Sequence, residues 1–305
     1  AVVGYDTNRM ELSSSLSAKW RPSDRVGVSA VLREELFGRD WAPLIPALFL
    51  DGVLSKRGNL VAKASISRNF RFPTLNDLYF LPGGNPDLRP ERGWTYDVGA
   101  EFEIGKRGGC SLRGGVTWFD SRIKDWILWL PTTKGFFSPE NVKDVHAYGV
   151  EGELHGGIAL GRGWRIEMDA TLSWTPSINE GERRSPADKS VGKQLPYIPE
   201  LSATIVGRLS WRGWSLLYNW SFYSERYTMS SNDITLTGKL PKYFMSNIAL
   251  EKSLSLRWAD FNFKGTINNL FDEEYMSVLS RPMPGINFGL FVGISPKWGR
   301  QTSDR

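Results

Sequence analysis

The sequence predicts an all-β protein, a transmembrane antiparallel up-and-down β-barrel, from three observations. Apolar and polar residues alternate with period two, short and long connections alternate along the chain, and the polar strand face is rich in ionised side chains. Period-two alternation is typical of β-strands with two different faces. The chain has no run of about 18 apolar residues, so no membrane-spanning helix is expected.

The alternation is clearest in residues 164–174. One face carries Trp164, Ile166, Met168, Ala170, Leu172 and Trp174, and the other carries Arg165, Glu167, Asp169, Thr171 and Ser173. The same pattern predicts thirteen strands, at about residues 10–20, 24–37, 46–56, 58–70, 95–105, 110–130, 146–160, 164–174, 201–211, 214–225, 243–256, 261–271 and 286–298. Most match the ~9–11 residues that a tilted strand needs to cross a bilayer.

Connection length predicts the orientation of the strands. Short connections are expected at residues 21–23, 57, 106–109, 161–163, 212–213 and 257–260, and long ones at 38–45, 71–94, 131–145, 175–200, 226–242 and 272–285. Bacterial outer-membrane barrels have short periplasmic turns and long extracellular loops. With residues 286–298 descending toward the periplasm, every long connection falls outside the cell.

The charged strand face favours a membrane barrel over a soluble one. It carries Lys63, Glu101, Glu103, Arg113, Glu151, Glu153, Arg165, Glu167, Asp169, Arg208 and Lys264. Burying such ions in a dry core costs several kcal/mol each, so this face is expected to line a wet lumen. An aromatic girdle is expected from Trp20, Trp118, Trp174, Trp211, Trp214 and Trp298 near the strand ends.

Composition narrows the class further. The net charge of +5 is dispersed, which disfavours nucleic acid, and the single Cys110 excludes an internal disulfide. Residues 1–20 show no signal-peptide pattern. Thirteen strands would leave two open edges in lipid, so we expect residues 1–298 to be the C-terminal portion of a larger barrel, followed by a polar tail at 299–305.

Three motifs carry a family resemblance. The stretches FRFPTLNDLYFLPGGNPDLRPE (70–91), YGVE (148–151) and INNLFDEEY (267–275) are similar to the paired FRAP and NPDL boxes, the G-[VIL]-E strand entry and the N-L-F-[DN]-x-x-Y motif of TonB-dependent outer-membrane receptors. The matching positions are Phe70, Arg71, Pro73, Asn85, Pro86, Leu88, Glu91, Gly149, Glu151, Asn269, Leu270, Asp272 and Tyr275.

The resemblance implies a multi-pass outer-membrane protein with 22 strands and a plugged lumen. Residues 10–298 would be strands 10 to 22, with the plug, the energy-coupling box and about nine strands missing. Trp298 would be the terminal aromatic, although seven residues follow it. The implied partners are outer-membrane lipid and lipopolysaccharide, a small-molecule nutrient, the TonB–ExbB–ExbD system through the missing plug and a surface lipoprotein lid.

The 71–94 connection is predicted to be stiff. Prolines at 73, 82, 86 and 90 restrict the backbone, and Gly83–Gly84 permits a tight reversal. Ligand contact is expected from Tyr79, Phe80, Asn85, Trp129, Phe137, Tyr227 and Tyr275. The alternative is that Arg71, Pro73, Asn85, Pro86 and Leu88 only brace the loop, and that the aromatics belong to a girdle or to the loop core.

Within this family, the sequence of residues 73–91 resembles receptors of the cobalamin type most closely. We therefore expect cobalamin or a related corrinoid, with a ferric siderophore as the alternative. Haem is disfavoured because no histidine lies between Phe70 and Leu88, and the chain's two histidines, His146 and His155, fit solvated or hydrogen-bonded roles. No intrinsic cofactor or metal is expected; Ca²⁺ at Asp233 or at residues 272–274 is an alternative that lacks EF-hand spacing.

Two other function classes are the alternatives to a transporter. An outer-membrane hydrolase would need a nucleophile placed beside a histidine or carboxylate, and no such motif is present, so no catalytic residue is expected. A passive pore or structural barrel would not need the 70–91 motif.

Overall fold

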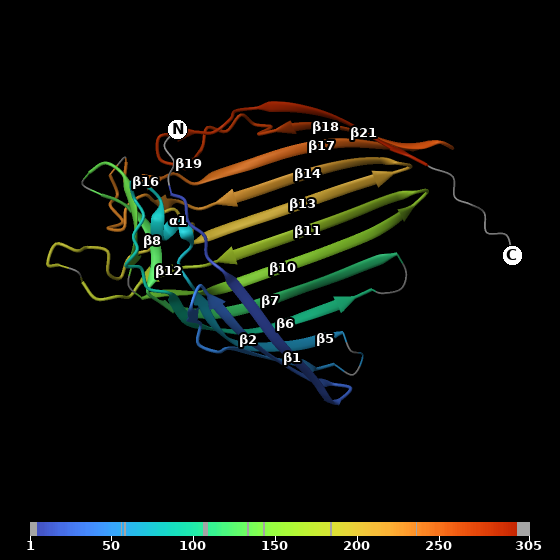
Figure 1. The fold of residues 1–305 in the computed structure, drawn as a ribbon. Coiled ribbons are helices and arrows are strands. Elements are labelled where there is room, and N and C mark those ends of the chain that lie inside the picture. The colour runs from blue at the N-terminus through green and yellow to red at the C-terminus, as the bar shows by residue number, and fades with distance from the viewer. Residues whose placement is uncertain are drawn as a thin grey trace.

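The computed structural model describes residues 5–55, 57, 59–105, 109–132, 134–142, 144–183, 185–235 and 237–297. One antiparallel sheet of 15 strands dominates it (Figure 1). The strands that follow one another across this sheet are β1 (Glu11–Ser23), β2 (Val26–Phe37), β4 (Ile45–Val53), β5 (Leu60–Arg71), β6 (Glu91–Ile104), β7 (Cys110–Lys124), β10 (Val145–Gly161), β11 (Trp164–Trp174), β13 (Leu201–Trp211), β14 (Trp214–Tyr223), β17 (Tyr243–Ser255), β18 (Ala259–Asn268) and β21 (Asn287–Pro296).

The predicted thirteen-strand meander is confirmed within these ranges, because each strand pairs with the next along the path. The sheet also includes β3 (Asp40–Trp41) and β12 (Ser177–Asn179), and three small hairpins lie outside it. These are β8 (Trp126–Pro131) with β9 (Phe137–Val142), β15 (Arg226–Tyr227) with β16 (Lys239–Leu240), and β19 (Met276–Val278) with β20 (Arg281–Pro282).

The predicted strand at 110–130 is wrong. It ends at Lys124, and Asp125 takes a φ of 58°, a left-handed conformation that Asp tolerates better than most residues. The chain then leaves the wall and forms β8 of a separate hairpin. The predicted start of the preceding strand, at residue 95, is too late, because β6 already pairs at Glu91 with Arg71.

A short helix that the strand pattern did not predict, α1 (Leu75–Tyr79), interrupts the long connection between β5 and β6. Thr74 and Asp77 form a capping box in which each side chain binds the other residue's backbone amide. This arrangement satisfies helix N-terminal donors that would otherwise have no partner.

The long connections gather at one end of the sheet and the short turns at the other (Figure 1). α1, β8, β12, β16 and β19 all lie at the long-loop end. The predicted segregation of loop length is therefore confirmed, apart from residues 56, 58 and 106–108 of two short turns, which lie outside the described residues. All long loops share one rim of the curved wall.

The two faces of the sheet have the opposite polarity to those of a soluble protein, with the apolar face exposed on the outside. Large apolar side chains on the convex face are exposed, such as Val98 (56%) and Val116 (51%). The concave face carries cross-strand ion pairs, including Lys63 with Glu101 and His155 with Asp169. A soluble sheet buries its apolar face, so this arrangement is that of a membrane barrel wall.

Two aromatic rows border the apolar face. At the short-turn end Trp164 stacks on Trp211 with ring centroids 5.3 Å apart, and at the long-loop end Tyr148 contacts Trp174 edge-on at 5.9 Å. Trp174 lies ten residue steps after Trp164 along β11, which is about 33 Å along a strand. A tilt near 45° reduces this to roughly 25 Å, the height of the apolar band of such barrels. Trp298, the predicted terminal aromatic, lies outside the described residues.

Among the described residues the barrel is not closed. β1 and β21 form the two edges of the sheet and each pairs on one side only. No helix in this part of the chain is long and apolar enough to cross a membrane. The described wall is therefore a curved open sheet with one apolar and one ionised face.

Replacing one apolar residue of the convex face by a charged one tests the assignment of that face to lipid. We expect Met168→Arg to lower the free energy of unfolding by about 2–4 kcal/mol, because the guanidinium would sit near the bilayer midplane. Thr171→Arg, on the concave face of the same strand, is the matched control and should change it by less than about 1 kcal/mol. Denaturant unfolding in phospholipid vesicles measures both, and equal losses would contradict the assignment.

Candidate functional site

The candidate site is a loop block at the long-loop rim, made of residues 72–90 between β5 and β6 and the β8–β9 hairpin. Segments far apart in sequence meet there, and the motif residues at 70–91 hold them together. Buried polar groups form the joints of the loop block, which matters because an unpaired polar group in such a position is costly.

Glu91 is the first joint. It is 7% exposed, and its carboxylate accepts hydrogen bonds from Arg71 Nη2 at 2.7 Å and Arg71 Nε at 2.8 Å. Its Oε1 also accepts the backbone N–H of Ile127 at 2.8 Å. The motif pair thus ties the wall to the first strand of the hairpin, which supports the predicted bracing role of Arg71.

Asp77 is the second joint. Its Oδ2 accepts from Thr74 N at 2.9 Å and Thr74 Oγ1 at 2.7 Å, while its Oδ1 accepts the indole N–H of Trp129 at 2.9 Å. Burial alone would raise the pKa of Asp77, but these hydrogen bonds and the charge of Arg71 outweigh it and hold that pKa below its usual value. An ionised carboxylate therefore joins α1 to the hairpin.

Two asparagine side chains, Asn85 and Asn141, link residues 85–89 to β9 of the hairpin. Asn85 donates from Nδ2 to the carbonyl of Pro139 at 3.1 Å, and its Oδ1 accepts the backbone N–H of Asp87 at 3.0 Å. Asn141 accepts from Arg89 N at 2.8 Å and donates back to Arg89 O at 2.9 Å. Asn85, predicted as a ligand contact or as a brace, thus links two parts of the loop block, and its part in ligand contact stays a prediction.

The two glycines of the motif allow this close approach. A Cβ on Gly83 would lie 2.0 Å from the carbonyl oxygen of Phe137, and a Cβ on Gly84 would lie 2.5 Å from Phe80 N. Any side chain at either position would push the hairpin away or open the turn. The prediction of a tight reversal here is confirmed.

The loop block leaves an aromatic surface open to solvent. Tyr79 is 41% exposed, Phe80 40% and Phe137 59%. Phe80 packs edge-on against Trp129 with ring centroids 5.8 Å apart, so these two rings share one patch. Trp129 differs from the other three because its indole N–H is already bound to Asp77. A role of this surface in ligand contact stays a prediction.

Tyr275 belongs to a second aromatic cluster, whereas the ring of Tyr227 lies apart from it and has the ammonium of Lys239 5.8 Å from its centroid. Tyr275 packs on Tyr243 with ring centroids 4.8 Å apart, and Tyr243 packs on Tyr223 at 5.2 Å. The guanidinium of Arg226 lies 4.8 Å from the Tyr243 ring centroid. Arg226 is 5% exposed and its Nε has no partner among the described residues. Burial lowers the pKa of this arginine.

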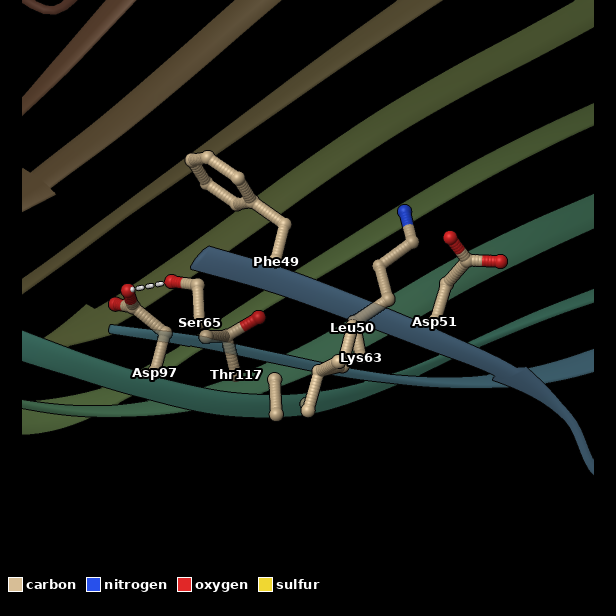
Figure 2. A pocket seen from close by; sticks show the side chains of 9 residues that line it. Phe49, Leu50, Asp51, Lys63, Ser65, Asp97 and Thr117 are labelled. Carbon is tan, nitrogen blue, oxygen red and sulfur yellow. Dashed lines mark hydrogen bonds between the residues drawn. The ribbon is translucent and has the colours of Figure 1, made fainter. Parts of the chain in front are cut away.

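Below the rim, the concave wall contains a hollow of about 320 Å³ between β4, β5, β6 and β7. Figure 2 shows Phe49, Lys63, Ser65 and Asp97 standing into it, with Ser65 Oγ donating to Asp97 Oδ2 at 2.6 Å. Phe49 is 43% exposed on this charge-rich face. Strand periodicity gave no reason to single out this apolar contact point.

The later motifs are structural joints in the same way. A Cβ on Gly149 would lie 1.9 Å from the carbonyl oxygen of Trp174, and Glu151 accepts from Ser173 Oγ at 3.3 Å on the concave face. Asn269, 2% exposed with φ 50°, binds Glu273 through both ends of its amide. Leu270 N donates to Ser246 O at 2.8 Å.

The histidines and the acidic candidates are engaged by protein groups. His146 lies between Asp120 at 2.7 Å and Glu180 at 2.8 Å, and His155 contacts Asp169 at 2.6 Å. Asp272 accepts the backbone N–H of Ile286 at 2.7 Å. Across the described ranges no three His, Cys, Asp or Glu side chains gather in a metal-holding group, and calcium binding stays a prediction.

Sequence reasoning missed Asp77, Arg226, Tyr223 and Tyr243. Thr74 followed three residues later by Asp77 is a helix-start pattern, so that signal was present but overlooked in a strand-rich region. The tyrosine row becomes visible only when β14 and β17 are paired, because Tyr223 and Tyr243 occupy facing register positions.

The family comparison agrees with this geometry. The model described as "TonB dependent receptor-like, beta-barrel" matches residues 3–270. The chain belongs to this receptor family. Members of the family are receptors and transporters rather than enzymes, and their barrels lie in the outer membrane.

Individual relatives of this receptor chain include the vitamin B12 transporter BtuB of Photobacterium profundum, 28% identical over 229 residues. A second is the vitamin B12 transporter BtuB of Vibrio vulnificus, 30% identical over 128 residues. The alignments cover 72% and 42% of this chain but only 33% and 18% of those relatives. The chain therefore corresponds to a part of their length.

Solved structures share the receptor fold at low identity. The copper transporter OprC superposes with a TM-score of 0.69 at 17% identity, covering 95% of this chain and 48% of its own. The ferric enterobactin receptor PfeA of Pseudomonas aeruginosa gives 0.68 at 18% identity, covering 95% and 45%. These likenesses show the fold and leave the ligand open.

Removing the Glu91 carboxylate tests the first joint. We expect Glu91→Ala to speed hydrogen exchange at the Ile127 amide by about thirtyfold, which corresponds to roughly 2 kcal/mol for a lost hydrogen bond to a charged group. Asp87→Asn, an exposed change in the same loop, should leave that amide unchanged. Protection that persists in Glu91→Ala would show that other contacts hold the hairpin.

The ionised carboxylate of Asp77 predicts that the stability of the fold depends on pH. Its folded pKa lies below the usual value of 3.8, so its ionised form stabilises the fold above about pH 4, and this contribution is lost as the pH falls through the folded pKa. The difference in melting temperature between the wild type and Asp77→Asn should be constant from pH 7 to about pH 5 and shrink below about pH 4. A difference that grows on acidification would contradict the assignment.

Proposed function

We propose that this chain forms part of the wall of an outer-membrane transporter that takes up cobalamin or a related corrinoid, driven by the TonB–ExbB–ExbD system. Further strands would pair with the open edges of β1 and β21 to close the barrel, and a plug would fill the lumen. The relatives' greater length is consistent with both additions.

The observation that carries the uptake proposal is the loop block. Its ionised and amide joints hold exposed Tyr79, Phe80 and Phe137 in place above a wet, charged wall. A rigid aromatic surface binds a large ligand with little loss of conformational entropy. Cobalamin is preferred because two sequence relatives are named vitamin B12 transporters.

A ferric siderophore is the second candidate. The observation that favours it is the row Tyr223, Tyr243 and Tyr275 beside the buried Arg226, since a cation among aromatic rings suits an anionic chelate. A passive pore would need neither this cluster nor the loop block. Coverage of the loop block by a surface lipoprotein stays a prediction.

Equilibrium binding of cyanocobalamin, measured on this chain together with the proposed further strands and plug, tests the assignment of cobalamin as the transported ligand. We expect Phe80→Ala and Phe137→Ala each to weaken binding by about tenfold, the loss typical of an aromatic anchor. Trp258→Ala is the control, because Trp258 is 62% exposed but lies in the turn between β17 and β18 at the opposite rim.

Uptake of labelled cobalamin should also stop when the proton-motive force is collapsed. No binding at micromolar cobalamin would refute the preferred cargo, and tighter binding of a ferric siderophore would support the second candidate. Ion conductance through the chain reconstituted alone would favour the passive pore.

A further inference from the structure

The imidazole of His146 lies between two carboxylates at the long-loop rim. Its Nε2 is 2.7 Å from Asp120 Oδ2 of β7, and its Nδ1 is 2.8 Å from Glu180 Oε1 in the connection between β11 and β13. A neutral imidazole has one N–H donor and one acceptor nitrogen. If the ring were neutral, one nitrogen lone pair would face a carboxylate oxygen with no proton between them. The geometry is therefore that of an imidazolium that donates to both carboxylates.

Two cations of β7 lie on the same side of the wall as this ring. Arg122 takes the register position directly opposite His146. Its side chain is 66% exposed and its Nε lies 3.5 Å from Asp120 Oδ1, so water and a carboxylate screen its charge. The ammonium of Lys124 lies 4.0 Å from Asp144 Oδ2. Each cation is thus partly neutralised by a carboxylate, while two carboxylates contact the imidazole directly.

The ring lies on the loop side of the membrane-spanning part of β10. Tyr148, which belongs to the aromatic row at the long-loop end, packs on it with ring centroids 4.9 Å apart, and His146 itself pairs with Ile178 of the loop strand β12. The histidine side chain is 13% exposed. Burial alone would lower the pKa of His146, but the hydrogen bonds and charges of Asp120 and Glu180 outweigh burial and raise that pKa above its ordinary value.

The two carboxylates differ in their freedom to move. Asp120 belongs to a wall strand, its side chain is 20% exposed, and it also contacts Arg122. Glu180 is the first residue after β12, and its side chain is 48% exposed. When the ring loses a proton it can donate only one hydrogen bond. Glu180 is the partner that can turn into water, so its contact with the ring is the one that breaks.

The base of the loop after β11 is held independently of the histidine. β12 pairs with β10, and residues 192–195 form backbone hydrogen bonds back onto β12. Two hydrogen bonds hold the start of the tip, residues 180–183: Glu180 N donates to Asp144 O at 2.8 Å, and Gly181 N donates to Asn179 Oδ1 at 3.1 Å. Loss of the contact between Glu180 and the imidazole therefore loosens the tip and leaves the base paired.

We propose that His146 is a proton-dependent latch, which holds residues 180–183 against the wall while its ring is protonated and releases them when the ring is neutral. Because the folded-state pKa of His146 is raised, the stabilisation is fully present below the ordinary histidine pKa of 6.5 and is lost as the pH rises through the folded-state pKa. The latch is thus closed in acid and open in alkali. It does not depend on which ligand the protein transports.

Hydrogen exchange of the Gly181 amide, in the protein reconstituted into phospholipid vesicles, tests the latch. Protection is expressed relative to an unstructured peptide at the same pH, because the intrinsic exchange rate itself changes with pH. We expect the protection of this amide in the wild type to fall by about tenfold between about pH 6 and about pH 9, the effect of one lost hydrogen bond between charged groups.

Two variants separate a titrating latch from a purely structural contact. His146→Gln should give low protection at both pH values, because an amide side chain cannot gain a proton in this range. Glu180→Gln should keep its protection as the pH rises, because its amide N–H can donate to the neutral imidazole nitrogen. His155→Gln is the matched control and should behave as the wild type, since His155 lies on the concave face and contacts Asp169 at 2.6 Å.

An NMR titration of the imidazole gives a second readout. The chain has two histidines, so in His155→Gln the remaining signal belongs to His146, and we expect it to titrate above about pH 6.5. Adding Glu180→Gln should lower that titration midpoint. Heat-modifiable migration on gels verifies that each variant is folded. Equal protection of Gly181 at both pH values in the wild type, or a loss with rising pH that persists in His146→Gln, would overturn the proposal.

Discussion

The structure depends on one constraint: backbone N–H and C=O groups at membrane depth have no water to bind. Only structures that satisfy these groups internally are stable there, and the thirteen-strand meander does so by pairing each strand with its neighbours in sequence, except at the outer edges of β1 and β21. The inverted polarity follows directly. Once the strands are paired, apolar side chains are favourable on the convex face and ions are favourable only on the concave one.

The same scarcity of water shapes the rim. Where the chain leaves the regular ladder, buried carboxylates and amides replace its hydrogen bonds. Glu91 accepts a strand amide that has no place in the main sheet, and Asp77 caps α1 while it holds an indole. The loops are thereby built as rigid extensions of the wall, which connects the fold to its capacity to present aromatic rings to a ligand.

The two faces handle charge differently. On the concave face carboxylates and cations pair across strands, as between Arg208, Glu251 and Lys264, and water screens them. On the convex face near the rim, Arg68 has no such partner within the described part of the chain.

The sequence by itself determined the strands, their faces and the segregation of loop length, because period-two alternation is a local property that each strand carries alone. It also singled out Arg71 and Glu91 as positions of a motif. It could not end the strand at Lys124, since the apolar pattern continues past it and the competing contact, Glu91 with Ile127, spans 36 residues. Nor could it separate Trp129, whose indole is bound by Asp77 52 residues away, from the exposed Phe137. Such distinctions depend on which distant groups meet at the rim, and only the tertiary structure decides that.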